Sequence, residues 1–129
     1  MILLDTHVLL WLAKDPAKLS NKASAAIREA ARSDGIAISM MTVWELAVLA
    51  ARGKVNLTGT VEAFVENITA RTAIRPITPK VAALASQFPP HYPKDPSDRL
   101  IGATALAEGM ALVSADQYIR RSGIVRTIW

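Results

Sequence analysis

Short apolar runs alternate with longer helix-forming stretches along this chain, and this alternation strongly limits how the chain can fold. Strand-length runs stand at Ile2–Leu4, Ile36–Ser39 and Ala111–Ser114, and less regular ones at Ile74–Ile77 and Val125–Ile128. Strands that alternate with helices pair in parallel and carry helices on both faces of the sheet. Runs that are apolar throughout fit strands buried on both faces. We therefore predict the α/β class, as a three-layer α/β/α sandwich with a central, mostly parallel sheet.

Caps and breakers predict a helix in each interval between these runs. The predicted helices are Thr6–Ala13, Ser20 to near Gly35, Thr42–Arg52, Thr60–Arg71, Pro79–Gln87, Asp95–Gly109 and Gln117–Arg121. Ser20 and Thr78 are good N-cap residues, and proline is favoured at the first helical position, as at Pro79 and Pro96. No linker, repeat or low-complexity segment divides the chain. Residues 1–129 are therefore predicted to form one domain, at a common domain size.

Composition excludes several classes of protein. The chain has 51% hydrophobic and 20% charged residues, which is typical of a globular protein. It has no cysteine, so it can form neither a disulfide scaffold nor a thiolate-bound zinc site. This fits a cytoplasmic location. The apolar N-terminal run is interrupted by Asp5 and His7 and has no basic residue before it, so we expect neither a signal peptide nor a membrane span.

The net charge suits a polyanionic partner such as nucleic acid. Fifteen Lys and Arg residues against eleven Asp and Glu residues give a formal charge of +4 and a pI near 9.8. The basic residues are scattered and form no dense tract. Aromatic residues make up only 5% of the chain, which disfavours a base-stacking platform of the kind that single-strand-binding proteins use.

Four acidic residues stand at positions where a parallel sheet places its ligand sites. Asp5 directly follows the first predicted strand, and Asp116 lies two residues past the strand Ala111–Ser114. Both belong at the edge where the strands end, which is where ligands bind in such sheets. Glu45 and Asp98 each lie in the first turn of a predicted helix, and Glu45 follows a strand that ends at the same edge. For Asp98 we expect the opposite edge if its helix runs antiparallel to the next strand, so that joining the others requires a different crossing.

A group of carboxylates predicts a divalent cation. Like charges raise one another's pKa, and a cation relieves this repulsion. Mg²⁺ prefers oxygen ligands, usually one or two carboxylates together with waters and substrate phosphates. No spacing rich in His or Cys favours zinc. Carboxylate-bound metal ions hydrolyse phosphodiesters by activating a water and stabilising the attacking and leaving oxygens.

Four short motifs, in order, resemble those of a known family. They are Asp5-Thr6-His7, Thr42-Val43-Trp44-Glu45-Leu46, Asp95-Pro96-Ser97-Asp98-Arg99-Leu100-Ile101 and Ser114-Ala115-Asp116. Over essentially its whole length the chain resembles PIN-domain ribonucleases, and most of all the VapC-type toxins of bacterial toxin–antitoxin pairs. The resemblance implies a PIN-like sandwich in which Asp5, Glu45, Asp98 and Asp116 are the catalytic and metal-binding residues for Mg²⁺ or Mn²⁺. It also implies that the third acid does reach the others.

The same resemblance implies an endoribonuclease that leaves a 5′-phosphate and a 3′-hydroxyl. The expected partners are RNA, a cognate VapB-type antitoxin and a second copy of the chain. Ala-rich helices around Ala23–Ala31 and Val48–Ala51 are expected to form the dimer and antitoxin grooves. Ser97 stands where this subgroup often has Phe, a mild departure that leaves all four acids in place.

Some acids in these motifs have a structural interpretation beside the chemical one. Thr42-x-x-Glu45 is also a capping box. Asp95 before Pro96 is interpreted as an N-cap and not as a fifth ligand. Asp116 can simply cap the helix after it. As a metal ligand it is expected to make its contact through water, because the fourth acid of such a cluster often lies in the outer shell.

The neighbouring polar and aromatic residues are interpreted in the same way. Thr6 and Ser114 are candidates to hydrogen-bond a carboxylate or a metal-bound water, and Arg99 to contact phosphate or form an ion pair. A two-metal mechanism needs no histidine, so His7 is expected to pack or hydrogen-bond locally, and His91 to serve its loop or an interface. Among the tryptophans, Trp11 and Trp44 are expected in the core or an interface and Trp129 over a sheet edge.

Three other functions are alternatives to the ribonuclease. A receiver-like signalling domain needs a phospho-accepting Asp after its middle strand, and Ile38-Ser39-Met40 offers none. A catalytically inactive RNA-binding or scaffolding PIN domain predicts the loss of at least one acid, and none is missing. A DNA-directed nuclease would use the same residues, and the sequence does not distinguish it.

Overall fold

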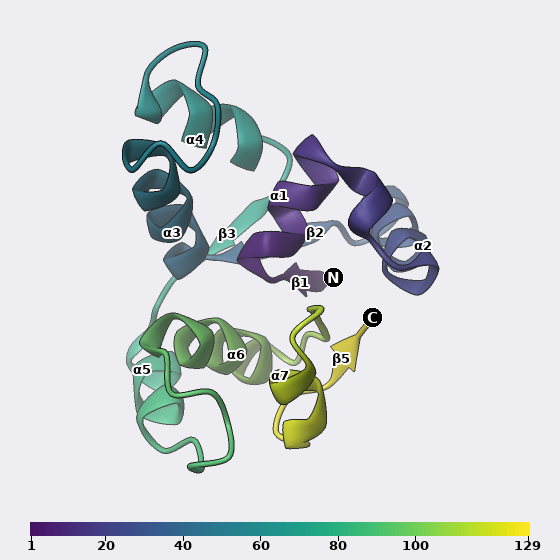
Figure 1. Ribbon diagram of the computed structural model, residues 1–129. Coiled ribbons are helices and arrows are strands. Elements are labelled where there is room, and N and C mark those ends of the chain that lie inside the picture. The colour runs from purple at the N-terminus through teal and green to yellow at the C-terminus, as the bar shows by residue number, and fades with distance from the viewer.

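The central feature of the computed structural model, which describes residues 1–129, is a five-stranded sheet (Figure 1). Its strand order is β3-β2-β1-β4-β5, and every neighbouring pair is parallel. The strands are β1 (Ile2–Leu4), β2 (Ile36–Ser39), β3 (Ala73–Arg75), β4 (Leu112–Val113) and β5 (Thr127–Ile128). The predicted α/β class is confirmed.

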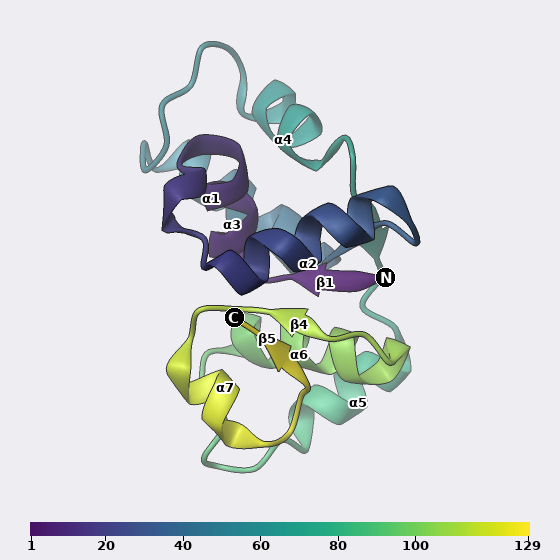
Figure 2. The same ribbon diagram turned by 90° about the vertical axis from the view of Figure 1, so that its right-hand side faces the viewer.

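Helices cover both faces of this sheet. They are α1 (Thr6–Lys14), the 3₁₀ turn η1 (Pro16–Lys18), α2 (Asn21–Arg32), α3 (Met40–Ala51), α4 (Val61–Thr69), α5 (Pro79–Ser86), α6 (Pro96–Glu108) and α7 (Gln117–Ser122). Figure 2 shows α1 to α4 on one side of the sheet and α5 to α7 on the other. The predicted three-layer sandwich is therefore confirmed as well. No helix combines the length and the apolar character needed to cross a membrane.

Successive residues of the central strands enter two separate cores. Leu3 and Leu112 pack with residues of α5, α6 and α7, whereas Leu4 and Val113 pack with residues of α1, α2 and α3. All four are 0% exposed. Neighbouring strand residues point to opposite faces, so a strand covered on both sides must be apolar at every position. This explains the uninterrupted apolar runs of the sequence.

Two predicted boundaries were wrong. The helix α3 begins at Met40 and not at Thr42, because Ser39 at the end of β2 is its N-cap and accepts a 3.0 Å hydrogen bond from the amide of Met41. Thr42 lies inside the helix, so Thr42-x-x-Glu45 is not a capping box. The strand β3 ends at Arg75, before Pro76, which has no amide hydrogen to continue the ladder.

The prediction that an antiparallel helix would place Asp98 at the opposite edge of the sheet was also wrong. The helix α6 ends at Gly109, whose φ of +66° favours glycine, and β4 begins shortly afterwards at Leu112. A helix that leads into the start of a strand and runs antiparallel to it must itself begin beside that strand's end. An ordinary crossing thus delivers Asp98 to the edge where Asp5 lies.

Candidate active site

Asp5 is fixed where β1 passes into α1. Its Oδ1 accepts a 2.9 Å hydrogen bond from the amide of Thr6, which makes Asp5 the N-cap of α1, and its Oδ2 accepts a 2.7 Å bond from Ser114 Oγ. The residue is only 4% exposed. Since Ser114 follows β4, these bonds join the ends of two neighbouring strands. The predicted contact between Ser114 and a carboxylate is confirmed.

Glu45 is held to the same place by a threonine. Thr6 Oγ1 donates a 2.6 Å hydrogen bond to Glu45 Oε1 and lies 3.0 Å from Thr42 Oγ1, which is fully buried. Burial raises the pKa of Glu45, the hydrogen bond from Thr6 opposes this, and the charges of Asp5 and Asp95 raise the pKa further. The predicted role of Thr6 as a donor to a carboxylate is confirmed.

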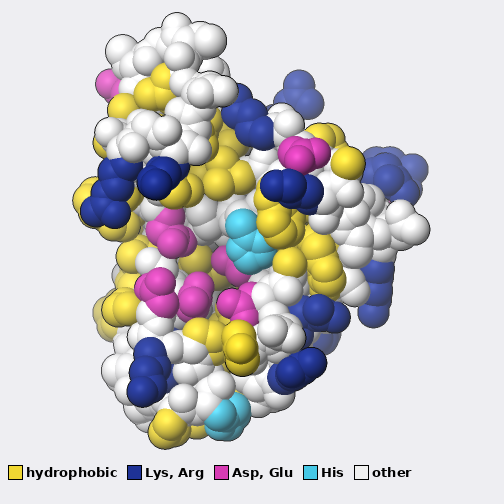
Figure 3. Space-filling view, in the orientation of Figure 1, with side chains coloured by type: hydrophobic (Ala, Val, Ile, Leu, Met, Phe, Trp, Pro, Cys, Tyr) yellow, Lys and Arg dark blue, Asp and Glu magenta, His cyan; other side chains and the backbone are white.

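The pKa of Asp98 is affected by the charges of all the other acids in the group. Burial raises its pKa most, and the charges of Asp5, Asp95, Asp116 and Glu45 add to the effect, so that the pKa of Asp98 reaches about 7. Figure 3 shows acidic side chains gathered in the middle of one face, beside a histidine. The structure therefore brings all four predicted acids into one group and adds Asp95 to it.

Asp95 and Asp116 each cap a helix as well. Asp95 Oδ1 accepts a 2.9 Å bond from the amide of Ser97, which confirms Asp95 as the N-cap of α6. Asp116 Oδ1 accepts bonds of 2.8 and 3.2 Å from the amides of Tyr118 and Ile119 at the start of α7. One oxygen of each carboxylate is thus committed to the backbone. The electrostatic influence of Asp95 on the site was not predicted, because its capping role already explained it.

The acids as a set fit a hard divalent cation. No three of the Asp, Glu and His side chains converge closely enough to enclose one ion by themselves. Mg²⁺, however, characteristically takes one or two carboxylates and completes its shell with waters and phosphate oxygens. Every candidate donor is an oxygen. Burial raises the pKa of Asp98 most, and the repulsion between carboxylates that raises it further is one that a cation would relieve.

His7 makes local contacts beside these acids. Its Nε2 accepts a 3.3 Å hydrogen bond from the amide of Ala115, so in the neutral ring Nδ1 carries the hydrogen. Nδ1 lies 3.7 Å from Asp5 Oδ2. The His7 ring also packs edge-on against Trp11, with 4.9 Å between the ring centroids, and Trp11 packs against Trp129 at 5.8 Å. The predicted local role of His7 is confirmed.

Two other interpretations need correction. Trp44 is 62% exposed, so it is not a core residue, and the interface interpretation alone remains for it. Arg99 forms no ion pair with Asp98. Its guanidinium donates to four backbone carbonyls of the preceding loop, at Phe88, Pro89, Tyr92 and Pro93, over 2.8 to 3.2 Å. These bonds use nearly all the donors of the guanidinium, so Arg99 stabilises the loop that precedes Asp95.

Arg99→Lys is expected to destabilise the protein by about 1–3 kcal/mol, because an ammonium cannot reproduce a planar fork that bonds four carbonyls. Urea denaturation monitored by circular dichroism measures the change in the free energy of unfolding. Arg52→Lys, at an exposed position after α3, is the matched control. An unchanged free energy in Arg99→Lys would show that the loop does not depend on these bonds.

Comparison with known proteins identifies the family. The profile of the PIN domain matches residues 2–124. The chain belongs to the PIN-domain family. It is also 38% identical over 130 residues to Ribonuclease VapC22 of Mycobacterium tuberculosis, a match that covers 99% of this chain and 98% of that protein.

Solved structures show the same PIN fold. A chain of the VapBC2 complex from Rickettsia felis, bound to a DNA fragment from its promoter, matches with a TM-score of 0.75 and 18% identity over 98% of this chain and 97% of that one. A chain of DNA-bound VapBC from Salmonella typhimurium matches with a TM-score of 0.74 and 19% identity, again over 98% and 97%.

Proposed function

We propose that this PIN-domain protein is a metal-dependent endoribonuclease and the toxin of a toxin–antitoxin pair. The observation that carries the proposal is the group formed by Asp5, Glu45, Asp98 and Asp116 at the carboxyl edge of the sheet. Its support is the 38% identity to a ribonuclease over nearly the whole of both chains. We propose a cytoplasmic location, where RNA is available.

In this proposal the four acids hold Mg²⁺, or Mn²⁺, and are the catalytic residues. A bound ion would activate the attacking water and stabilise the charge that develops on the phosphodiester. The hydroxyls of Thr6 and Ser114 keep Glu45 and Asp5 facing the site through bonds of 2.6 and 2.7 Å. Asp116 has one oxygen engaged with the backbone of α7, so the other suits a contact through water.

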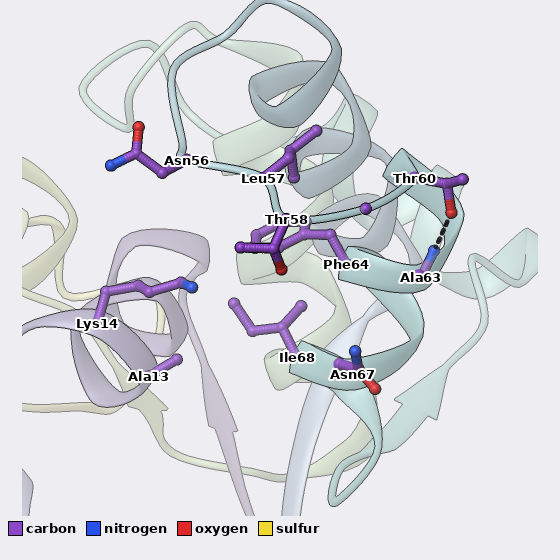
Figure 4. A pocket seen from close by; sticks show the side chains of 11 residues that line it. Ala13, Lys14, Asn56, Leu57, Thr58, Thr60, Ala63, Phe64, Asn67 and Ile68 are labelled. Atoms are coloured by element: carbon purple, nitrogen blue, oxygen red, sulfur yellow. Dashed lines mark hydrogen bonds between the residues drawn. The ribbon is translucent and has the colours of Figure 1, made fainter.

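The proposed protein partners are a VapB-type antitoxin and, for a dimer, a second copy of the chain. Neighbours of this fold were solved as VapBC complexes. An apolar groove of about 630 Å³ between α1, α2 and α4 offers the antitoxin a surface, lined among others by Leu9, Leu12 and Ile68. It shares Ile68 with a pocket of about 490 Å³ between α1 and α4, into which Lys14 reaches (Figure 4). A short upstream reading frame with a DNA-binding N-terminus would support this pairing.

Cleavage of RNA by the purified chain, free of any partner, tests the activity. We expect a fluorescently labelled RNA to be cut in the presence of Mg²⁺ or Mn²⁺ and to stay intact with EDTA, because the carboxylates alone provide no activated water. DNA of the same sequence is the control. Cleavage that persists in EDTA would contradict the metal mechanism, preferential cleavage of the DNA would favour a DNA-directed nuclease, and no cleavage of either would favour a binding or scaffolding protein.

A further inference from the structure

A basic pocket lies beside the acids, and nothing in the proposed chemistry uses it. Its volume is about 400 Å³ and its lining is mainly polar: Lys22, Gln117, Arg120, Arg121, Thr127 and Trp129. Lys22 comes from the first turn of α2 and the two arginines from the last turn of α7. Two elements far apart in the sequence thus place three cations around one hollow.

These three cations have no counter-ion within the protein. Some other basic side chains are engaged: Arg32 pairs with Glu29 at 3.0 Å, Arg75 pairs with Glu108, and Arg99 bonds loop carbonyls. Lys22, Arg120 and Arg121 form no salt bridge, and no acidic residue lines the basic pocket. Cations gathered without an acid attract an anion, and the guanidinium fork suits phosphate oxygens in particular.

Two structural connections join the basic pocket to the acids. Asp116 caps α7, Gln117 is the next residue, and Arg120 lies one helical turn after Asp116. On the other side, Trp129 packs against Trp11, and Trp11 against His7, whose Nδ1 is 3.7 Å from Asp5 Oδ2. In Figure 3, basic side chains over α7 and the lower end of α2 stand to the right of the acidic group. The basic pocket and the acids are therefore neighbours on one face.

We propose that the basic pocket binds backbone phosphates of the RNA strand next to the bond that is cut. This inference rests on the proposed function and assigns the direction in which the strand leaves the acids. A phosphodiester strand with one phosphate at the acids must continue across the surface, and here it meets three unpaired cations instead of further carboxylates. The recognition is by charge and phosphate geometry, so it is independent of base sequence.

Salt-dependent RNA binding tests the proposal in EDTA, where no cleavage interferes. The probe is a fluorescein-labelled single-stranded 20-nucleotide RNA without terminal phosphates, followed by fluorescence anisotropy over a range of KCl concentrations. We expect Arg120→Gln/Arg121→Gln to weaken binding about tenfold at low salt and to lower the slope of log K against log[salt] by about 1.4, since each phosphate contact on a single strand contributes roughly 0.7. In the presence of metal, the KM for cleavage of the same RNA should rise.

The matched control removes two equal charges elsewhere. Arg52→Gln/Lys54→Gln alters exposed cations just beyond the end of α3 and should leave affinity within about twofold. Should the arginine pair prove necessary for folding, as judged by circular dichroism, Lys22→Gln on α2 tests the same pocket and should lower the slope by about 0.7.

Other outcomes would overturn the assignment. Unchanged RNA binding by the pocket variants, or equal weakening by the control, would remove the basic pocket from RNA recognition. Loss of antitoxin binding with RNA binding intact would assign the basic pocket to an acidic protein surface. These results differ from failure of the proposed function, in which the unchanged chain itself neither binds nor cuts RNA.

Discussion

Asp98→Asn is expected to lower RNA cleavage by roughly a thousandfold or more while making the metal-free protein more stable at pH 8. The loss follows because a neutral amide holds a divalent cation poorly, and several kcal/mol of transition-state stabilisation depend on that cation. The gain in stability follows from removing a charge that burial disfavours most and that the neighbouring acids repel. Asp98 is half-buried among four other acids, and the folded chain must accommodate its charge.

The sign of the stability change depends on pH. The pKa of Asp98 is raised to about 7 from an ordinary value of 3.8, so the folded state holds a proton that the unfolded state releases. Between about pH 4 and pH 7, rising pH therefore lowers the stability of the unchanged chain. Asn carries no proton and avoids this loss. Since Asp98 is only half-buried, solvent reduces both the cost of burial and the repulsion, and we expect a gain of about 1–2 kcal/mol at pH 8.

Thermal unfolding in EDTA at several pH values measures this effect beside a cleavage assay with Mg²⁺. The melting temperature of Asp98→Asn should exceed that of the unchanged chain by roughly 3–8 °C at pH 8, and the difference should vanish below pH 4. Glu66→Gln, at an exposed position of α4, is the control and should change neither quantity. Loss of stability at pH 8 would contradict the predicted cost of the Asp98 charge in the folded protein. Normal cleavage of RNA would show that Asp98 is not a metal ligand of the reaction.

The fold was predictable because the pattern of apolar residues along the sequence agrees with the burial of the strands and helices that they form. The strand Ile2–Leu4 is followed at once by a carboxylate that ends the strand and caps the next helix, so one short stretch specifies an element boundary and a site position together. The prediction of a helix start failed where two nearby residues were both suitable N-caps. Ser39 and Thr42 both suit an N-cap, and only the position at which β2 ends gives the role to Ser39.

The acids of the candidate site were predictable, but the hydrogen bonds that position them were less so. Carboxylates at strand ends are visible in the sequence, whereas the bonds from Thr6 to Glu45 and from Ser114 to Asp5 join residues 39 and 109 positions apart. Arg99 shows the limit most clearly. Next to Asp98 it looked like an ion-pair or phosphate partner, yet the loop before it offers four carbonyls in the geometry of a guanidinium fork.

Gly102→Ala is expected to destabilise the protein by about 2–4 kcal/mol, although alanine favours a helix interior by about 1 kcal/mol. Gly102 lies in the middle of α6 under the ring of Tyr92. A Cβ at this position would overlap Tyr92 Oη and lie 2.9 Å from Cζ of the same ring, and Phe88 closes the other side at 3.2 Å. Both rings are buried, so neither can move without opening the core.

The same change is expected to reduce RNA cleavage by about a hundredfold, because a displacement of α6 of order 1 Å would move Asp98 with it. Tyr92 Oη also donates a 3.2 Å hydrogen bond to the carbonyl of Asp98, so the ring and the acid are directly connected. Urea denaturation and the cleavage assay, carried out on the same preparations, measure both effects.

Tyr92→Phe tests whether the clash with the hydroxyl is the cause. Alone it should cost about 1 kcal/mol, through the lost hydrogen bond to the carbonyl of Asp98. Combined with Gly102→Ala it should recover part of the lost stability, since the atom nearest the new Cβ is gone while Cζ remains at 2.9 Å, and the double variant should be more stable than the sum of the single changes predicts by about 1–2 kcal/mol. Strict additivity would show that the Tyr92 hydroxyl is not the source of the clash, and a Gly102→Ala variant as stable as the unchanged chain would show that α6 tolerates a side chain there.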